Sequence, residues 1–208
     1  MIPRWFNENI CIANYAQSGE TTTSFMSEKR LGHNDEKDKG NKAGAFLNYY
    51  DNILSYVAKA KLKGANPIIV SPTARRTFSN GEVTNSHGDY PKAAKKATEN
   101  AGIPFIDLTQ MTTDMLQAYG DDNSKNFYVH YPAGTYSSNA LKDDTHFNPF
   151  GAFEISKCVI MGLKKVKSPI ISNLRDDWKD FDPKQPDNWK DFIWVPAPSV
   201  DSIKPDGN

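Results

Sequence analysis

The sequence predicts a mixed α/β protein in which the β-strands pair in parallel. Short, continuous apolar runs are typical of strands buried on both faces, and they occur at residues 9–15, 67–71 and 104–108. Segments with apolar side chains at helical spacing lie between and after these runs, at residues 46–62, 89–101 and 112–119. Because parallel strands need a crossover connection, usually a helix, this alternation indicates a layered α/β architecture.

The first third of the chain contains one strand, a long polar stretch and one helix. The strand at residues 9–15 leads into a threonine-rich turn at residues 17–23. Residues 28–44 are rich in Lys, Asp and Gly, which predicts a loop. The helix at residues 46–62 follows. Gly64, just beyond it, is typical of a helix C-terminus, because glycine accepts the left-handed conformation there.

The two helices in the middle of the chain carry their own boundary signals. Pro91 lies in the first turn of the helix at residues 89–101, and Gly102 follows its last residue. Gly120 closes the helix at residues 112–119. Proline is tolerated where a helix begins and glycine where it ends, so both helices have defined limits.

An acid and a histidine stand directly before the last predicted helix. Asn148 is a good N-cap, Pro149 fits the first turn, and apolar residues share one face, namely Ala152, Ile155, Val159 and Leu163. We therefore expect Asp143 and His146 in a tight turn ahead of a rigid element. A base with an orienting carboxylate is two of the three parts of a nucleophilic hydrolase site. The alternative is a surface turn in which Asp143 and Asp144 only cap the helix.

Two other segments could stabilise a developing oxyanion. Asn34 lies between Gly32 and Asp35, and its side-chain amide could donate a hydrogen bond. Gly19 follows the first strand, and its backbone N–H could be a second donor. The alternatives are an ordinary Asn-Asp turn and an ordinary strand-to-helix turn.

Taken together, these segments resemble the ordered consensus blocks of the SGNH hydrolases, and most closely the rhamnogalacturonan acetylesterases. The blocks are Asn-x-Ala-x-x-Gly-x-Thr-Thr, Gly-His-Asn-Asp and Asp-x-x-His-x-x-x-x-Gly-Ala, at residues 14–22, 32–35 and 143–152. Further similar phrases occur at residues 3–9, 63–67, 72–78 and 86–91. The resemblance covers roughly residues 2–163.

The resemblance implies a three-layer α/β/α fold of the flavodoxin type with a parallel sheet, and acyl transfer by a serine. His146 would be the general base, and Asp143 would fix its tautomer. Gly19 and Asn34 would donate to the oxyanion. The substrate would be an acetylated plant cell-wall polysaccharide or oligosaccharide of the pectin or rhamnogalacturonan type. No cofactor or metal is implied, and the family suggests a secreted or periplasmic protein.

The chain departs from the family pattern at the nucleophile. The family serine lies in a Gly-Asp-Ser motif after a first strand, and this motif is absent from the 208 residues. We expect Met1 to be an internal methionine or an artificial start. Ser18, next to the proposed oxyanion turn, is a weak substitute, and Ser71 at a strand end is more typical of a turn cap.

A second departure concerns the sheet. Where the family has a helix end and an apolar strand, only Leu31 separates Arg30 from Gly32. We therefore expect a sheet that is incomplete in its central strands. Each unpaired buried backbone group costs about 1–3 kcal/mol, so several would exceed a net stability of about 5–15 kcal/mol. A non-catalytic polysaccharide-binding relative or an inactive fragment are thus the alternatives to an esterase.

Charge and apolar content restrict the partners. Lys plus Arg and Asp plus Glu both number 25, so the formal net charge is zero. Nucleic-acid binders and proteins held on membrane surfaces need a basic excess, so we expect neither partner. No apolar run approaches the length of a membrane span, and no signal peptide is expected within these residues. Cys11 and Cys158 are predicted to be buried free thiols.

The last part of the chain, residues 168–208, predicts an aromatic and proline-rich extension and linker beyond a domain at residues 1–167. Trp-Lys-Asp-Phe occurs twice, beginning at Trp178 and at Trp189. We interpret Trp178, Trp189 and Trp194 as packing anchors, with a sugar-stacking platform as the alternative. A further module could follow residue 208.

Three more residues have open interpretations. Arg75 and Arg76 could meet an acidic sugar backbone, or they could belong to a solvated turn. His87 is expected to be a hydrogen-bonded structural histidine.

Overall fold

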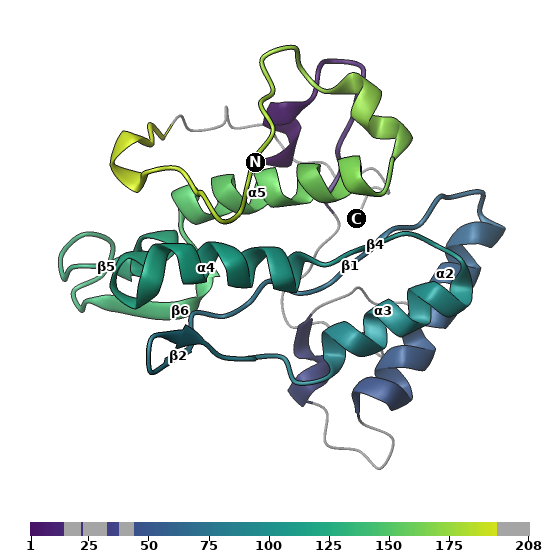
Figure 1. The fold of residues 1–208 in the computed structure, drawn as a ribbon, viewed down its shortest axis with the longest axis horizontal. Helices are drawn as coiled ribbons and strands as arrows, with labels where there is room; N and C mark the ends of the chain where they lie inside the picture. Colours follow the sequence, from purple (N-terminus) through teal and green to yellow (C-terminus); the bar gives the residue numbers. More distant parts are fainter. Residues whose placement is uncertain (15–21, 23–32, 38–43, 195–208) are drawn as a thin grey trace. The chain divides into compact units, whose positions relative to one another are not determined.

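The computed structural model describes residues 1–14, 22, 33–37 and 44–194 (Figure 1). It confirms the mixed α/β class, with helices and one parallel pair of strands. The chain divides into two compact units. Unit 1 comprises Met1–Ile12, Thr73–Ser86 and Gln110–Asn208, and unit 2 comprises Ala13–Pro72 and His87–Thr109. The boundary expected at residue 167 stays a prediction.

Unit 2 contains the parallel pair. Strand β1 (Ile69–Val70) runs beside β4 (Phe105–Ile106), with the Ser71 N–H donating to the Ile106 carbonyl at 3.0 Å. Both strands are shorter than expected, and β4 is limited at its C-terminal end because Leu108 already begins helix α4. Among the described residues β1 pairs only with β4, and the expected incompleteness of the sheet in its centre stays a prediction.

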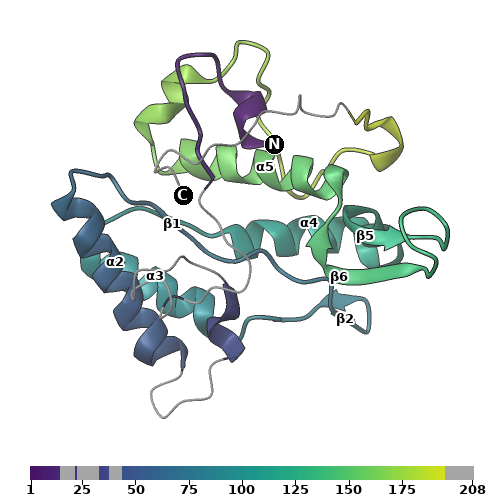
Figure 2. The same cartoon turned by 180° about the vertical axis from the view of Figure 1, so that it is seen from behind.

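Two helices pack together in unit 2, as Figures 1 and 2 both show for α2 (Tyr50–Leu62) and α3 (Tyr90–Ala101). A short π-helix, η3 (Ala45–Tyr49), precedes α2. The helix–helix contact buries a small apolar cluster consisting of Ile53, Val57, Ala94 and Ala97. Gly64 (φ 76°) and Gly102 (φ 60°) end the two helices in the left-handed region, so both predicted ends are confirmed.

The first predicted strand is wrong for the residues that can be described. Residues 9–14 form no strand, Ile12 is 37% exposed, and Cys11 is exposed rather than buried. An apolar run becomes a strand only where a neighbour takes up its N–H and C=O groups, and none of the described strands pairs with this run. The expected loop at residues 28–44 is also partly wrong, because η2 (His33–Lys37) is a 3-10 helix.

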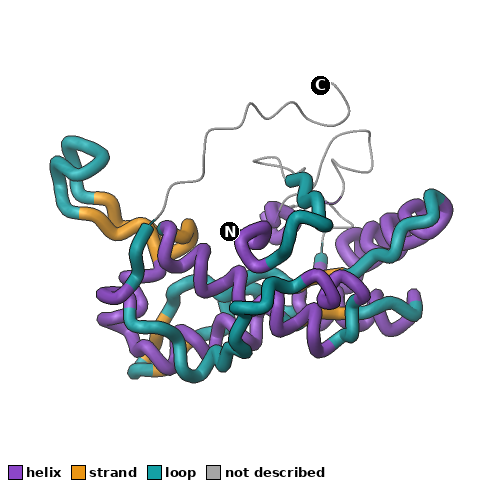
Figure 3. The backbone as a smooth tube through the Cα atoms, turned by 90° about the horizontal axis from the view of Figure 1, so that it is seen from above, coloured by secondary structure: helices purple, strands orange, loops and turns teal. Residues whose placement is uncertain are grey.

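Unit 1 combines helices with two antiparallel pairs. Strands β5 (Tyr128–Tyr131) and β6 (Leu141–Phe147) form the longer pair, drawn in orange in Figure 3 with the connecting loop in teal. A hairpin of β2 (Phe78–Ser79) and β3 (Glu82–Val83) was not expected from the sequence. Its turn is Asn80-Gly81, with φ values of 52° and 82°, as a tight two-residue hairpin requires.

Helix α4 (Leu108–Ser124) is longer than predicted at both ends. Gly120 leaves the helical conformation (φ 74°, ψ 169°), so the break was located correctly, and a further helical segment follows it. The 3-10 helix η4 (Lys125–Phe127) then leads into β5.

Helix α5 (Pro149–Lys165) begins as predicted, with Asn148 Oδ1 accepting the Gly151 N–H at 2.9 Å. Gly151 is required by a close approach, because a Cβ there would lie 2.0 Å from the carbonyl oxygen of Phe127. The predicted apolar stripe is only half-buried. The most buried positions lie on other faces and include charged residues, namely Glu154, Lys157, Cys158 and Ile160.

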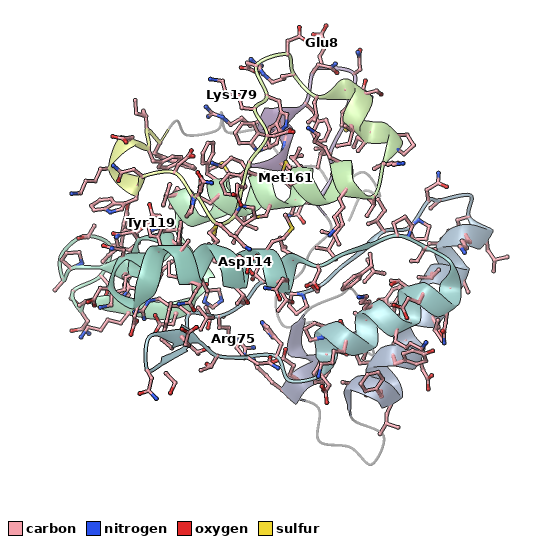
Figure 4. The ribbon with its side chains drawn as sticks, in the orientation of Figure 1. Glu8, Arg75, Asp114, Tyr119, Met161 and Lys179 are labelled. Atoms are coloured by element: carbon pink, nitrogen blue, oxygen red, sulfur yellow. The ribbon has the colours of Figure 1, made fainter. Side chains whose placement is uncertain are left out.

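The described part of the C-terminal extension belongs to unit 1 and packs on helix α5. Phe181 is buried, and its N–H points to Met161 Sδ at 3.4 Å (Met161 is labelled in Figure 4). Phe192 contacts Phe150 and Phe153, with ring centroids 5.4 and 5.2 Å apart. The two Trp-Lys-Asp-Phe phrases are therefore anchored by their phenylalanines.

The tryptophans of the extension differ from one another. Trp178 packs edge-on against Trp5 at 5.1 Å, as a packing anchor should. Trp189 and Trp194 are 41% and 48% exposed, so the anchor interpretation is wrong for these two. No helix in the described part of the chain is long and apolar enough to cross a membrane.

The two thiols should differ in reactivity. Cys11 is exposed, whereas Cys158 is fully buried, and burial together with the nearby Glu154 charge raises the pKa of Cys158 to about 12. Because the thiolate is the reactive form, a thiol reagent should modify one cysteine in the native protein and two in denaturant. A Cys11→Ser variant should show no modified cysteine until the protein unfolds. Reaction of both thiols in the native protein would contradict this packing.

Candidate active site

Asp143 and His146 lie in a bulge of strand β6. Val129 pairs with Asp143, and the next ladder pair joins Tyr128 to Phe147. The residues between Asp143 and Phe147 therefore loop out of the ladder, directly ahead of α5. The tight turn expected from the sequence is this bulge, and bulges of this kind re-aim side chains at the edge of a sheet.

The Asp143 carboxylate organises the bulge. Its Oδ1 accepts the N–H groups of Thr145 and His146 at 2.7 and 2.8 Å, and its Oδ2 lies 2.6 Å from His146 Nδ1. Partial burial raises the pKa of Asp143, but hydrogen bonds from His146 and Thr145 outweigh it and hold the pKa below its ordinary value. The ionised carboxylate therefore favours the tautomer with the proton on Nδ1.

The other ring nitrogen of His146 is left available. The side chain is 72% exposed, and no described residue hydrogen-bonds Nε2. With Nδ1–H fixed by Asp143, Nε2 carries the free lone pair. The pair has the geometry of a general base with its orienting acid.

Asp144, the neighbour of Asp143, ties the bulge to the rest of unit 1. Its Oδ1 accepts from Arg76 Nη1 and lies near His130 Nε2, both at 2.8 Å. Arg76 also donates to the Asp121 carbonyl at 2.7 Å and to Ser124 Oγ at 3.1 Å. Burial raises the pKa of Asp144, but the hydrogen bonds from Arg76 and His130 outweigh it and lower that pKa.

This network corrects one of the interpretations of Arg76. Its side chain is only 9% exposed and is ion-paired with Asp144 and Asp121, so it does not belong to a solvated turn. The sequence drew attention to Arg75 and Arg76, but it contained no signal for a partner far along the chain. The Arg75 N–H donates to Ser86 Oγ at 3.0 Å.

Replacing Arg76 with alanine should lower the free energy of unfolding by about 1–3 kcal/mol, because a half-buried carboxylate and a carbonyl lose their donor. Urea denaturation would measure the loss. Arg175→Ala is a matched control, since its pair with Asp177 is exposed and should change stability by less than about 0.5 kcal/mol. Equal losses in the two variants would contradict an anchoring role for Arg76.

The proposed oxyanion residues lie in unit 2 and are less completely described. Gly19 and the weak nucleophile candidate Ser18 fall outside the described residues. Asn34 belongs to η2, and its side chain also lies outside the description. The structure thus brings Asp143 and His146 together and leaves their arrangement with Gly19 and Asn34 as a prediction.

The two blocks that contain Gly19 and Asn34 nevertheless meet. The Thr22 N–H, from the first block, donates to both carboxylate oxygens of buried Asp35, from the second, at 2.9 and 3.0 Å. Asn52 on α2 donates to Thr22 Oγ1 at 2.9 Å, and Tyr90 donates to the Asp35 carbonyl at 3.0 Å. A cavity of about 500 Å³ lies beside these residues.

Two further expectations are confirmed in unit 2. His87 is buried with Nδ1 2.5 Å from Glu36 Oε1, as a structural histidine should be. Ser71 Oγ accepts the Thr109 N–H at 2.9 Å, so it caps the turn into α4. Within the described ranges, no cluster of three or more His, Cys, Asp or Glu residues is arranged to hold a metal ion.

Two curated proteins of Bacillus subtilis (strain 168) resemble this chain over most of its length. The rhamnogalacturonan acetylesterase RhgT is 30% identical over 189 residues, covering 81% of this chain and 81% of that protein. The probable rhamnogalacturonan acetylesterase YesY is 27% identical over 186 residues, covering 80% of this chain and 82% of that protein. A comparison with protein-family models gives no match.

Proposed function

The chain belongs to the SGNH hydrolase family, with the rhamnogalacturonan acetylesterases as its relatives, and we propose that it is a carbohydrate O-acetylesterase. The observation that carries the proposal is the hydrogen bond of 2.6 Å between Asp143 and His146, in a chain 30% identical to an enzyme of that name. Acyl transfer needs such a base beside its nucleophile.

In the proposed reaction, His146 Nε2 takes the proton of a serine hydroxyl while the serine oxygen attacks the acetyl carbonyl. Asp143 keeps the proton on Nδ1 and stabilises the imidazolium that forms. Gly19 N–H and the Asn34 amide would donate to the tetrahedral oxyanion. His146 then protonates the departing sugar oxygen, and water attacks the acyl-enzyme to release acetate.

The nucleophile is a separate part of the proposal. These 208 residues contain no Gly-Asp-Ser, and Ser18 beside Gly19 is the weak candidate within them. A serine-reactive phosphonate followed by mass spectrometry of the peptides would identify the labelled residue. Labelling that persists in a Ser18→Ala variant would exclude Ser18.

We propose an acetylated pectin or rhamnogalacturonan as the substrate. The exposed His146 ring supports a polymeric substrate, because a chain can lie across an open site. A secreted or periplasmic location is part of the same proposal, since cell-wall polysaccharide lies outside the cell that degrades it.

The direct test is acetate release. The protein should hydrolyse p-nitrophenyl acetate and release acetate from acetylated rhamnogalacturonan, but not from the same polysaccharide after alkaline deacetylation. A rate no higher than that of a His146→Ala variant on both substrates would contradict an esterase function.

Asn34→Ala should lower turnover about a hundredfold, because one preformed oxyanion donor is worth about that factor. The rate on p-nitrophenyl acetate under saturating substrate would measure it. Asn139→Ala, in the exposed β5–β6 loop, removes the same amide and should leave the rate unchanged. A loss of less than about threefold in Asn34→Ala would rule out the oxyanion role, since a threefold change corresponds to only about 0.6 kcal/mol of transition-state stabilisation.

A second candidate function follows from the missing Gly-Asp-Ser motif. A relative without a nucleophile could bind the polysaccharide and leave its esters intact. Calorimetric binding of acetylated oligosaccharides with no release of acetate over hours would favour this alternative.

A further inference from the structure

A second cavity lies within unit 1, between α5 and the C-terminal extension. Its volume of about 450 Å³ falls in the range of about 300–1,000 Å³ that is usual for ligand sites. Neither Asp143 nor His146 lines it. One wall is aromatic and consists of Phe150, Phe153 and Phe192, in which the Phe192 ring contacts the other two.

The rim of this cavity bears polar groups that have no hydrogen-bond partner among the described residues. The Arg4 guanidinium lies over the Phe153 ring at 5.5 Å, and no described residue accepts a hydrogen bond from it. The Asp191 carboxylate has no hydrogen-bond donor or ion-pair partner among the residues that the structure describes. Asn188 accepts the Lys190 N–H through Oδ1, so its NH₂ group remains available in the described structure.

The cavity is held in shape by the protein itself. Asp187 on its wall is ion-paired with Lys157 at 2.8 Å, and its N–H donates to Glu154 at 3.0 Å. Tyr119, labelled in Figure 4, donates to the Asp187 carbonyl at 2.5 Å and accepts the Trp189 N–H at 2.9 Å. A preorganised wall of this kind lowers the entropy lost when a ligand binds.

We propose that this cavity binds a neutral sugar ring of a polysaccharide, at a site separate from the proposed catalytic pair. The positive C–H edge of a pyranose face suits the negative face of an aromatic ring. Hydroxyl groups around the ring can donate to Asp191 and accept from Arg4 and the Asn188 amide. A donor and an acceptor beside an apolar surface match a sugar better than a purely apolar ligand.

The local charge selects a neutral sugar over an acidic one. The cavity lining contains one cation, Arg4, and two carboxylates, those of Asp187 and Asp191, of which Asp187 is ion-paired with Lys157 behind the wall. The carboxylates of the lining outnumber its cation, which opposes the carboxylate of a uronic acid. Helix α5 contributes Phe150 and Phe153 and begins just after His146, so a sugar held here sits on the element that follows the proposed base.

The test is a titration of the ¹⁵N-labelled protein with methyl α-rhamnopyranoside, followed by the Asn188 side-chain amide and the Trp189 indole signals. Both should shift in a saturable way in the millimolar range. Asp191→Asn should weaken binding at least about tenfold, as expected for a lost charged hydrogen bond. Asp176→Asn makes the same charge change on the exposed extension and should bind like the wild type.

Galacturonic acid, the anionic probe, should bind more weakly than the neutral glycoside. No saturable shift, tighter binding of galacturonic acid, or an equal effect of Asp176→Asn would overturn the proposal. His146→Ala distinguishes it from the proposed esterase function, because this variant should bind the sugar normally. Sugar binding without acetate release would contradict only the esterase, and acetate release without sugar binding would contradict only this site.

Discussion

Turnover of an acetylated sugar should fall by about 10²–10⁴-fold when His146 is replaced by alanine, which is the usual contribution of a general base. The reason lies in the bulge of β6. Asp143 fixes Nδ1 at 2.6 Å and holds the His146 N–H at 2.8 Å, so Nε2 is presented to solvent in one orientation. Alanine removes the imidazole that is proposed to accept the nucleophile's proton.

Rates of acetate release at saturating substrate would measure this effect, with circular dichroism to confirm folding. His130→Ala is the matched control. It removes an imidazole from the paired strand β5, but Arg76 still holds Asp144, so its rate should fall far less. A loss in His146→Ala no greater than that in His130→Ala would refute the assignment of His146 as the base.

The free energy of unfolding should fall by about 3–5 kcal/mol in Lys157→Met, because the change leaves a buried carboxylate without its partner. Glu154 is 0% exposed, and Lys157 Nζ lies 2.6 Å from its Oε1. The same ammonium pairs with Asp187 at 2.8 Å and lies 4.2 Å from the centre of the Phe181 ring. No other cation is placed to take over both carboxylates in the described structure.

The loss should grow as the pH rises. Burial raises the pKa of Glu154 above its ordinary value of 4.5, and Lys157 offsets this only in part. Without Lys157, the pKa of Glu154 in the native state rises further, so the native carboxyl holds its proton to higher pH than the unfolded chain does. A native state that binds more protons loses stability with rising pH. Urea denaturation at pH 5 and at pH 8 should therefore give the larger loss at pH 8.

Two controls make this prediction sharp. Lys92→Met breaks an exposed pair with Asp89 and should cost less than about 1 kcal/mol. The double change Lys157→Met with Glu154→Leu removes both buried charges and should recover most of the stability, as apolar replacements of buried ion pairs do. An unstable double variant, or a loss in Lys157→Met as small as in Lys92→Met, would show that the pair is not a buried one.

Features that depend on neighbouring residues in the chain could be predicted. The Asn148 cap and the glycines that end α2 and α3 were located correctly, because capping involves residues within one turn of each other. The contact between Asp143 and His146 belongs to the same class, since three positions along the chain bring carboxylate and imidazole together once the backbone turns. Resemblance to a known family added the expected roles of Gly19 and Asn34, which stay predictions.

Features that depend on contacts between residues far apart in the chain could not be predicted from the sequence. Residues 9–14 have the apolar pattern of a strand, but a strand exists only when another strand accepts its hydrogen bonds, and a single sequence does not say whether one is there. The apolar stripe on α5 likewise marks a helix without saying which face another element will cover.

The amino-acid sequence alone therefore determines where several helices begin or end, the parallel pairing of β1 with β4 and the contact between Asp143 and His146, because these follow from local spacing or from the alternation of strands with helices. Tertiary structure alone decides that Arg76 anchors Asp144 and that Glu154 and Lys157 are buried beneath the extension. Arg76 and Asp144 lie 68 residues apart, and the burial of α5 depends on the extension that follows it. Such contacts form only when the chain closes long loops, and the energy that favours one closure over another comes from packing that no local pattern contains.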